Sequence, residues 1–191
     1  MVLTASGWQV EPAGAERQRV DDEEIGFYDG REFRTFKEFS QPAGTAIAAG
    51  ANYVIKAVVP INVILSGLSL NFDNGQIRME TVIGGTEGGV FGETLPLFAA
   101  NNMGVPDRSL VPGGGFYLPK TILTAGGTLT GGTVIDVIRL KVENSTGAAA
   151  SVGNIPQDER GVAANTYYFR LFNIGAGVAE GTFKARLEER S

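Results

Sequence analysis

The chain carries neither His nor Cys among its 191 residues. The two side chains most often used for nucleophilic, metal and neutral-pH proton chemistry are therefore missing. A serine nucleophile would need a lysine as its base, and no lysine stands in a Ser-x-x-Lys pattern. The lysines are Lys37, Lys56, Lys120, Lys141 and Lys184. We therefore expect a protein that is not an enzyme and that uses no cofactor.

Neighbouring carboxylates occur in Asp158-Glu159-Arg160 and in Glu188-Glu189-Arg190. Paired carboxylates can do acid–base work if a rigid frame holds them at the right separation. Adjacent residues in a strand point to opposite faces, and a loop does not fix their separation. We therefore favour exposed ion pairs with the neighbouring arginines over an acid–base site.

Three short motifs suggest chemistry that their surroundings argue against. Asp73-Asn74-Gly75 resembles part of a calcium loop, but the residues after it alternate as a strand, which favours a hairpin turn and no metal. Asn144-Ser145-Thr146 matches an N-glycosylation acceptor, but Met1 to Val10 does not resemble a signal peptide, so we favour a turn. Gly113-Gly114-Gly115 is not followed by Lys-Ser or Lys-Thr, so it does not match a phosphate loop.

Aromatic residues gather at Tyr167, Tyr168 and Phe169. They could stack on a sugar or a base. Strand alternation places Tyr168 on one face and its two neighbours on the other, so we favour core packing on both faces. A binding module would instead expose an aromatic shelf near Tyr117 or Tyr168.

The composition excludes several classes of protein. The net charge is −5 and the isoelectric point is about 4.8. A negative surface repels phosphate backbones, which argues against a nucleic-acid partner. The longest uncharged apolar run, between Lys56 and Asp73, is too short and too polar to span a membrane. We expect a soluble protein without a membrane partner.

Residues 1–31 differ from the rest, with scattered apolar residues and the acidic run Asp21-Asp22-Glu23-Glu24. We interpret them as an extended N-terminal arm that orders against a partner; a disordered leader is the alternative. A lone Trp is unusual in a solvated tail and favours the arm. The candidate partner-binding residues are Trp8, Asp21, Asp22, Phe27 and Tyr28.

From residue 32 onward the pattern is typical of β-strands. Val and Ile are frequent in Tyr53–Val59 and Ile61–Leu65, and Pro60 between them predicts an edge position or a bulge. Apolar and polar residues then alternate on both sides of Asn74-Gly75, which is the strongest short-range signal of a β-hairpin. We predict that these two arms pair with each other.

The segment 84–132 is rich in Gly and Pro, so we predict short strands separated by ordered loops. Thr133–Val142 shows little alternation, which predicts a strand covered on both faces. Asn165–Ile174 is an aromatic strand, and Thr182–Glu188 alternates with Phe183, Ala185 and Leu187 inward. No stretch predicts a long helix, so the sheets must cover each other. We predict one antiparallel β-sandwich domain over 32–191, jelly-roll-like, with long Gly-rich loops at 84–132.

The residues 161–189 read GVAANTYYFRLFNIGAGVAEGTFKARLEE, which resembles the last hairpin of many β-sandwich modules. With the charged arm, RTFKEFS, and the LPLF and NNM segments in Gly-rich loops, the chain from Phe33 onward resembles small virion structural proteins of tailed bacteriophages. This resemblance implies a non-enzymatic decoration (cement) protein on the capsid surface of the virion.

For such a protein the implied partners are the major capsid protein and further copies of the chain, with a trimer favoured. Two other functions stay open. One is a glycan- or receptor-binding module on a tail or fibre, and the other is a component of the tail or connector.

Overall fold

The computed structural model describes residues 2–4, 7–9, 31–41, 43–72, 75–99, 109–111, 115–141 and 160–189. Every regular element in these ranges is a β-strand, and each pair of neighbouring strands is antiparallel. The prediction of an all-β, antiparallel fold is confirmed.

Seven strands have eight residues or more: β3 (Glu32–Phe39), β4 (Asn52–Val59), β5 (Val63–Phe72), β6 (Gln76–Ile83), β14 (Thr133–Lys141), β16 (Asn165–Asn173) and β17 (Gly181–Glu189). The shorter strands are β1 (Val2–Thr4), β2 (Gly7–Gln9), β7 (Thr86–Gly88), β8 (Glu93–Leu95), β9 (Phe98–Ala99), β10 (Ser109–Val111), β11 (Gly115–Tyr117), β12 (Ile122–Ala125), β13 (Thr128–Thr130) and β15 (Arg160–Val162).

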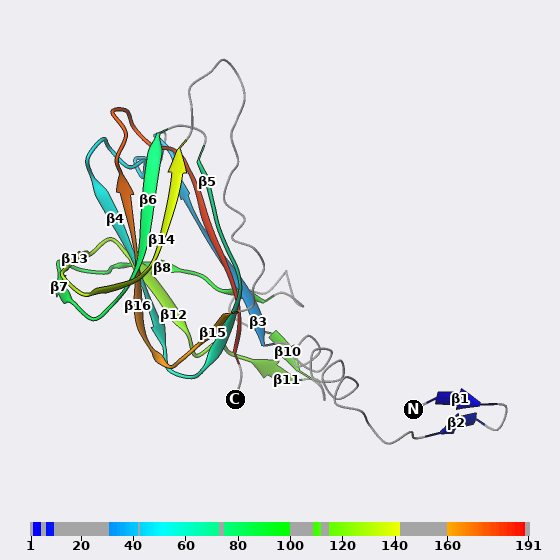
Figure 1. Cartoon of the computed structure of the whole chain (residues 1–191). Coiled ribbons are helices and arrows are strands. Elements are labelled where there is room, and N and C mark those ends of the chain that lie inside the picture. The colour runs from blue at the N-terminus through cyan, green and yellow to red at the C-terminus, as the bar shows by residue number, and fades with distance from the viewer. Residues whose placement is uncertain are drawn as a thin grey trace, which may run out of the picture.

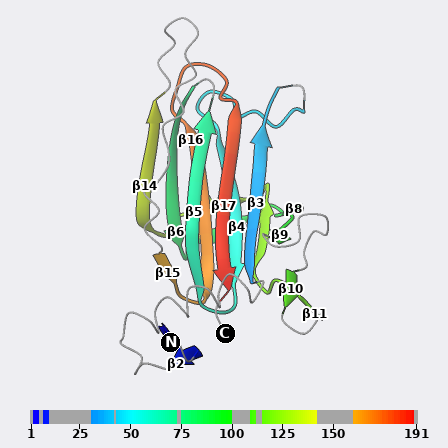
Figure 2. The same ribbon diagram turned by 90° about the vertical axis from the view of Figure 1, so that its right-hand side faces the viewer.

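Two sheets face each other, as Figures 1 and 2 show. The six-stranded sheet has the order β14-β6-β16-β4-β12-β8, and the five-stranded sheet has the order β15-β5-β17-β3-β9. This arrangement confirms the predicted sandwich. The long strands supply both layers because their Val, Ile, Phe and Tyr residues suit a pleated surface that is buried on at least one side.

The first four long strands do not lie beside their neighbours in the sequence, because the chain changes sheet from β3 to β4, from β4 to β5, and from β5 to β6. The predicted hairpin across Asn74-Gly75 is therefore wrong in its pairing. β5 pairs with β15 and β17, whereas β6 pairs with β14 and β16. The alternation identified the buried face of β5 and of β6 correctly. These two faces pack against each other across the core, from opposite sheets.

Pro60 follows the last residue of β4 and lies in the connection to β5. The prediction that it marks an edge or a bulge inside a strand is therefore wrong. Proline cannot donate to a ladder. Here it stands where a strand of one sheet ends and the chain crosses to the other.

The main core lies between the sheets. Its completely buried side chains include Phe33, Ile55, Met79, Leu171 and Phe183. Phe183, Ala185 and Leu187 of β17 are all buried, as the alternation predicted.

A second, smaller core lies on the outer face of the six-stranded sheet. Val54, Val82 and Tyr168 project there and are covered by Leu129 of β13 and by Phe91. Tyr168 is only 5% exposed, which confirms that this aromatic cluster packs on both faces of its strand. The Gly-rich segment thus contributes a cover for the sheet.

The described residues of the segment 84–132 form short strands, as predicted, from β7 to β13. β8 and β12 extend the six-stranded sheet, β9 extends the five-stranded sheet, and β7 pairs with β13. Near the N-terminus, β1 and β2 pair as a small hairpin that the sequence did not predict.

Candidate functional site

An exposed apolar surface lies along β14. Val134 is 42% exposed, Ile135 51% and Val137 48%. We call these three side chains the β14 surface. Figure 2 shows β14 at one edge of the sandwich, and within the described residues it pairs with β6 alone. The prediction that this strand is covered on both faces is therefore wrong.

A bulge and a charge modify this edge. The register of β14 against β6 shifts between Val134 and Asp136. The Asp136 carboxylate accepts hydrogen bonds from the Val137 N–H at 2.8 Å and from Arg160 at 2.9 Å. Bulges and inward charges are devices that discourage edge-to-edge sheet growth. The strand therefore exposes apolar side chains, while its bulge and its charge disfavour backbone pairing with a further strand.

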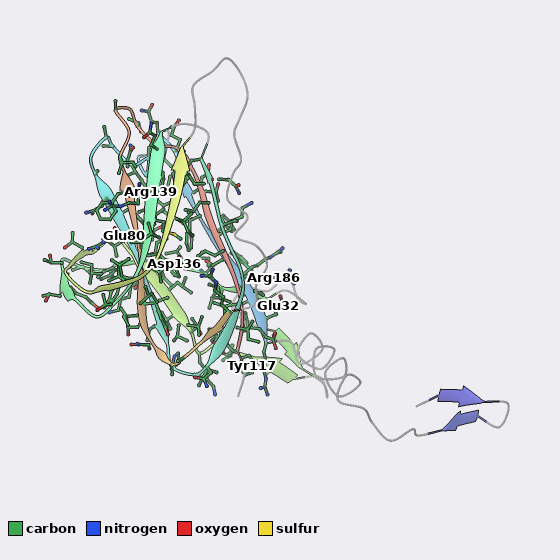
Figure 3. The ribbon with its side chains drawn as sticks, viewed as in Figure 1. Glu32, Glu80, Tyr117, Asp136, Arg139 and Arg186 are labelled. Carbon is green, nitrogen blue, oxygen red and sulfur yellow. The ribbon has the colours of Figure 1, made fainter. Side chains whose placement is uncertain are left out.

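The outer face of the five-stranded sheet has a different character. Figure 3 shows Glu32 and Arg186 on this sheet, and the two form an ion pair. An aromatic contact interrupts the polar surface, because the exposed Phe36 stacks on the half-buried Phe98 with ring centroids 5.9 Å apart. Among the described residues, this face carries charges of both signs and this aromatic contact.

Glu189 is completely buried, although the sequence predicted an exposed ion pair for it. Its carboxylate accepts hydrogen bonds from the Tyr117 hydroxyl at 2.7 Å, the Thr121 N–H at 2.6 Å and the Lys120 N–H at 2.9 and 3.0 Å. Buried carboxylates are tolerated when donors satisfy them in this way. Glu189 therefore fastens the end of the Gly-rich segment to β17.

Two other Tyr–Glu pairs fasten the same segment. The Tyr53 hydroxyl donates to Glu93 of β8 at 2.6 Å, and Lys37 pairs with the same carboxylate at 2.5 Å. The Tyr168 hydroxyl donates to Glu87 of β7 at 2.5 Å.

Glu87 also forms an ion pair with Lys56 at 2.7 Å. The hydrogen bonds from Lys56 and Tyr168 hold the pKa of Glu87 below its usual value. Burial, with the hydrogen bond to Glu87, raises the pKa of Tyr168 to about 12. In all three Tyr–Glu pairs the carboxylate is bound by donors of the fold, so these groups are structural.

Arg160 pairs with Asp136 of β14, 24 residues away. Asp158 and Glu159, which the sequence suggested as its partners, lie outside the described residues, as do Asp73 and Asn74 of the calcium-like motif. In the described ranges, no group of three or more His, Cys, Asp or Glu side chains could hold a metal ion. The same ranges contain no helix with the length and apolar character to cross a bilayer.

Of the candidate partner-binding residues, only Trp8 falls on a described element. It lies in β2 opposite Leu3 of β1. Asp21, Asp22, Phe27 and Tyr28 lie outside the described residues. The exposed shelf expected of a glycan-binding module does not form at Tyr168, which is buried, and Tyr117 is half-buried and bonded to Glu189.

Sequence reasoning missed the β14 surface because Val134-Ile135-Asp136-Val137-Ile138 reads as a run buried on both sides. The one available signal was Asp136, since a charge inside an apolar strand is frequent at sheet edges. Comparison with protein-family models, with curated proteins and with solved structures finds no significant match to this chain.

Proposed function

We propose that this chain is a non-enzymatic structural protein of a tailed-bacteriophage virion, where it decorates and stabilises the capsid. The proposal starts from the resemblance of the sequence to small virion proteins. The observation that carries it furthest is the β14 surface, with three apolar side chains exposed along one edge of a sandwich. Val134 and Val137 lie opposite Val82 and Glu80 of β6, whereas Ile135 between them borders the space between the sheets. Exposed apolar side chains that cluster are typical of surfaces that bind other proteins.

In this proposal the β14 surface rests on the major capsid protein and residues 1–31 reach neighbouring subunits. Trp8, Asp21, Asp22, Phe27 and Tyr28 are the proposed contacts of that arm. Apolar area removed from water contributes about 25 cal/mol per Å². Several copies bound side by side, with a trimer favoured, raise the overall affinity without any strong single contact.

We further interpret the sandwich as a jelly roll. Its long strands and β15 pair in the orders β15-β5-β17-β3 and β14-β6-β16-β4. This is the interleaving that two nested Greek keys produce. In this interpretation β7 to β13 are an insertion in the connection between β6 and β14.

A glycan-binding function on a tail or fibre is the second candidate, and one observation favours it. Phe36 is exposed and stacks on Phe98, so an aromatic contact does reach the surface. A tail or connector component is the third possibility. The Gly-rich segment that it would use for ring contacts is instead fastened to the sandwich through Glu87, Glu93 and Glu189.

Binding to capsids that lack this protein tests the proposal. We expect the wild-type chain to sediment with such capsids. A variant with Val134→Ser and Val137→Ser should bind at least tenfold more weakly, because it loses the apolar contact while its strand stays paired with β6. Phe36→Ser is the matched control and should bind as the wild type does.

Deletion of residues 1–31 should also reduce capsid binding, while the far-ultraviolet circular dichroism spectrum stays that of a β-protein. Wild-type chain that does not bind capsids would overturn the proposal. Loss of binding in the Phe36 variant, with normal binding in the β14 variant, would move the contact to the other sheet and favour the second candidate.

A further inference from the structure

A cavity of about 240 Å³ lies between the two sheets, on the side of the sandwich where β14 and β15 are the edge strands. Both sheets line it, mainly with apolar side chains. Among the lining residues are Ala57, Leu123, Phe169, Ala185 and Leu187. A well-packed interior leaves few voids larger than a water molecule, so a space of this size calls for an explanation.

Two irregular strands border the cavity, one from each sheet. β5 shifts register against β17 at Ser66, and β14 shifts register against β6 at Ile135. Both residues line the cavity. Bulges bend strands, re-aim side chains and are frequent next to binding sites. Two bulges, one in each sheet, border the same cavity. We therefore interpret the cavity as a binding site and not as a defect in core packing.

Two hydroxyl groups at the cavity have no hydrogen-bond partner in the described part of the chain. They are the Ser66 Oγ and the Thr121 Oγ1, and Thr121 is only 2% exposed. A buried hydroxyl without a partner costs free energy. A ligand with one hydrogen-bonding group would remove this cost.

The charges at the cavity cancel. Among the described residues that line it, only Asp136 and Arg160 are charged, and they pair at 2.9 Å across the gap between the two sheets. Both are partly exposed, and Ile135 beside them is half-exposed, so this ion pair marks the mouth. Figure 3 shows Asp136 on β14. Arg160 is paired with Asp136, so it is not free to bind an anionic ligand, and the Asp136 carboxylate would repel one. The site therefore favours a neutral ligand.

We propose that this cavity binds a small neutral molecule with an apolar alkyl or aryl body and one hydroxyl group. An apolar cavity of about 150 Å³ accepts benzene. The larger volume here suits a molecule of about ten non-hydrogen atoms by the same scaling. The ligand enters past Asp136 and Arg160, and its hydroxyl bonds to Thr121 or Ser66. This inference does not depend on the proposed virion function.

Isothermal titration calorimetry with 4-butylphenol tests the proposal on the full chain. We expect the wild type to bind this probe with a dissociation constant below about 1 mM. Ala185→Leu fills the cavity and should weaken binding at least tenfold. Ala48→Leu, in an exposed turn outside the cavity, should leave binding unchanged. Absence of binding to the wild type, or equal binding to the Ala185 and Ala48 variants, would overturn the proposal.

A comparison of two ligands tests the role of the Ser66 and Thr121 hydroxyl groups. 4-Butyltoluene has the same shape but replaces the hydroxyl by a methyl group, so the wild type should prefer 4-butylphenol. The double variant Ser66→Ala, Thr121→Val should lose that preference and still bind 4-butyltoluene. If the preference stays unchanged, the hydroxyls are not the recognition groups. Ala57→Leu serves as a second filled variant, with amide NMR spectra to confirm that each protein is folded.

Discussion

At the scale of single residues, Glu189 shows how the Gly-rich segment is held. Its buried carboxyl group accepts hydrogen bonds from the Tyr117 phenol and from the backbone N–H groups of Lys120 and Thr121. The donors come from residues 117–121, about 70 positions earlier in the chain. No local pattern could have predicted this contact, since Glu188-Glu189-Arg190 reads as an exposed charged end.

Replacing Glu189 by Gln should therefore destabilise the protein. The amide offers one acceptor oxygen where the carboxylate offers two, so one buried donor is left unpaired. We expect the free energy of unfolding to fall by about 1–3 kcal/mol, the usual cost of such a group. Urea denaturation measures it. Glu38→Gln, at an exposed position of β3, is the control and should change stability by less than about 0.5 kcal/mol.

The three Tyr–Glu pairs predict loss of stability in alkali. Burial, with the neighbouring carboxylate, raises the pKa of Tyr117 and of Tyr168 to about 12, and raises that of Tyr53 as well. Free tyrosine titrates near pH 10. The folded state favours the neutral phenol, so this stabilisation is complete below about pH 10 and is lost as the pH rises toward about 12.

Urea denaturation at several pH values between 9 and 12, with the phenolate absorbance recorded, measures this effect. A variant with Tyr53, Tyr117 and Tyr168 changed to Phe should lose stability at neutral pH and show a smaller fall in alkali. An unchanged alkaline slope in that variant would contradict the assignment.

At the scale of elements, the connection between β5 and β6 shows what alternation can and cannot predict. A two-residue period fixes which face of a strand is buried. It does not say which strand lies alongside. In a sandwich, two consecutive strands can bury their apolar faces against each other from opposite sheets, as Leu70 and Met79 do in the main core. The same local pattern therefore fits a hairpin and a crossing between sheets.

Gly75 makes this crossing possible. Its φ is +86°, and a Cβ atom there would lie 2.8 Å from the Cβ of Ala179. Gly75→Ala should therefore destabilise the protein by more than about 1 kcal/mol, as thermal denaturation would show. Gly177→Ala is the matched control, because a Cβ there meets nothing within 4 Å and its φ is not positive. Equal effects of the two substitutions would contradict this account of the corner.

The strand β14 shows a second limit of sequence reasoning. A run of Val and Ile predicts burial, yet whether a strand lies in the middle of a sheet or at its edge depends on strand order. That order is a property of the whole chain. The exposed Val134 and Val137 therefore became visible only in the structure.

At the scale of the whole molecule, the fold class could be predicted because each long strand carries its own signal of β-structure and no segment predicts a helix. The pairing between distant strands could not be predicted in this way. The resulting sandwich has a mixed-charge outer face on one sheet, a partly covered outer face on the other, and exposed apolar side chains on the edge strand β14. The central claim is that this molecule acts by adhesion to a larger protein lattice.

Electron cryo-microscopy of virions with and without this protein tests that claim most directly. We predict that its density lies on the outer surface of the head, bridges neighbouring capsid subunits, and is absent from particles without the protein. Density on the tail or its fibres, with a bare head, would contradict the account.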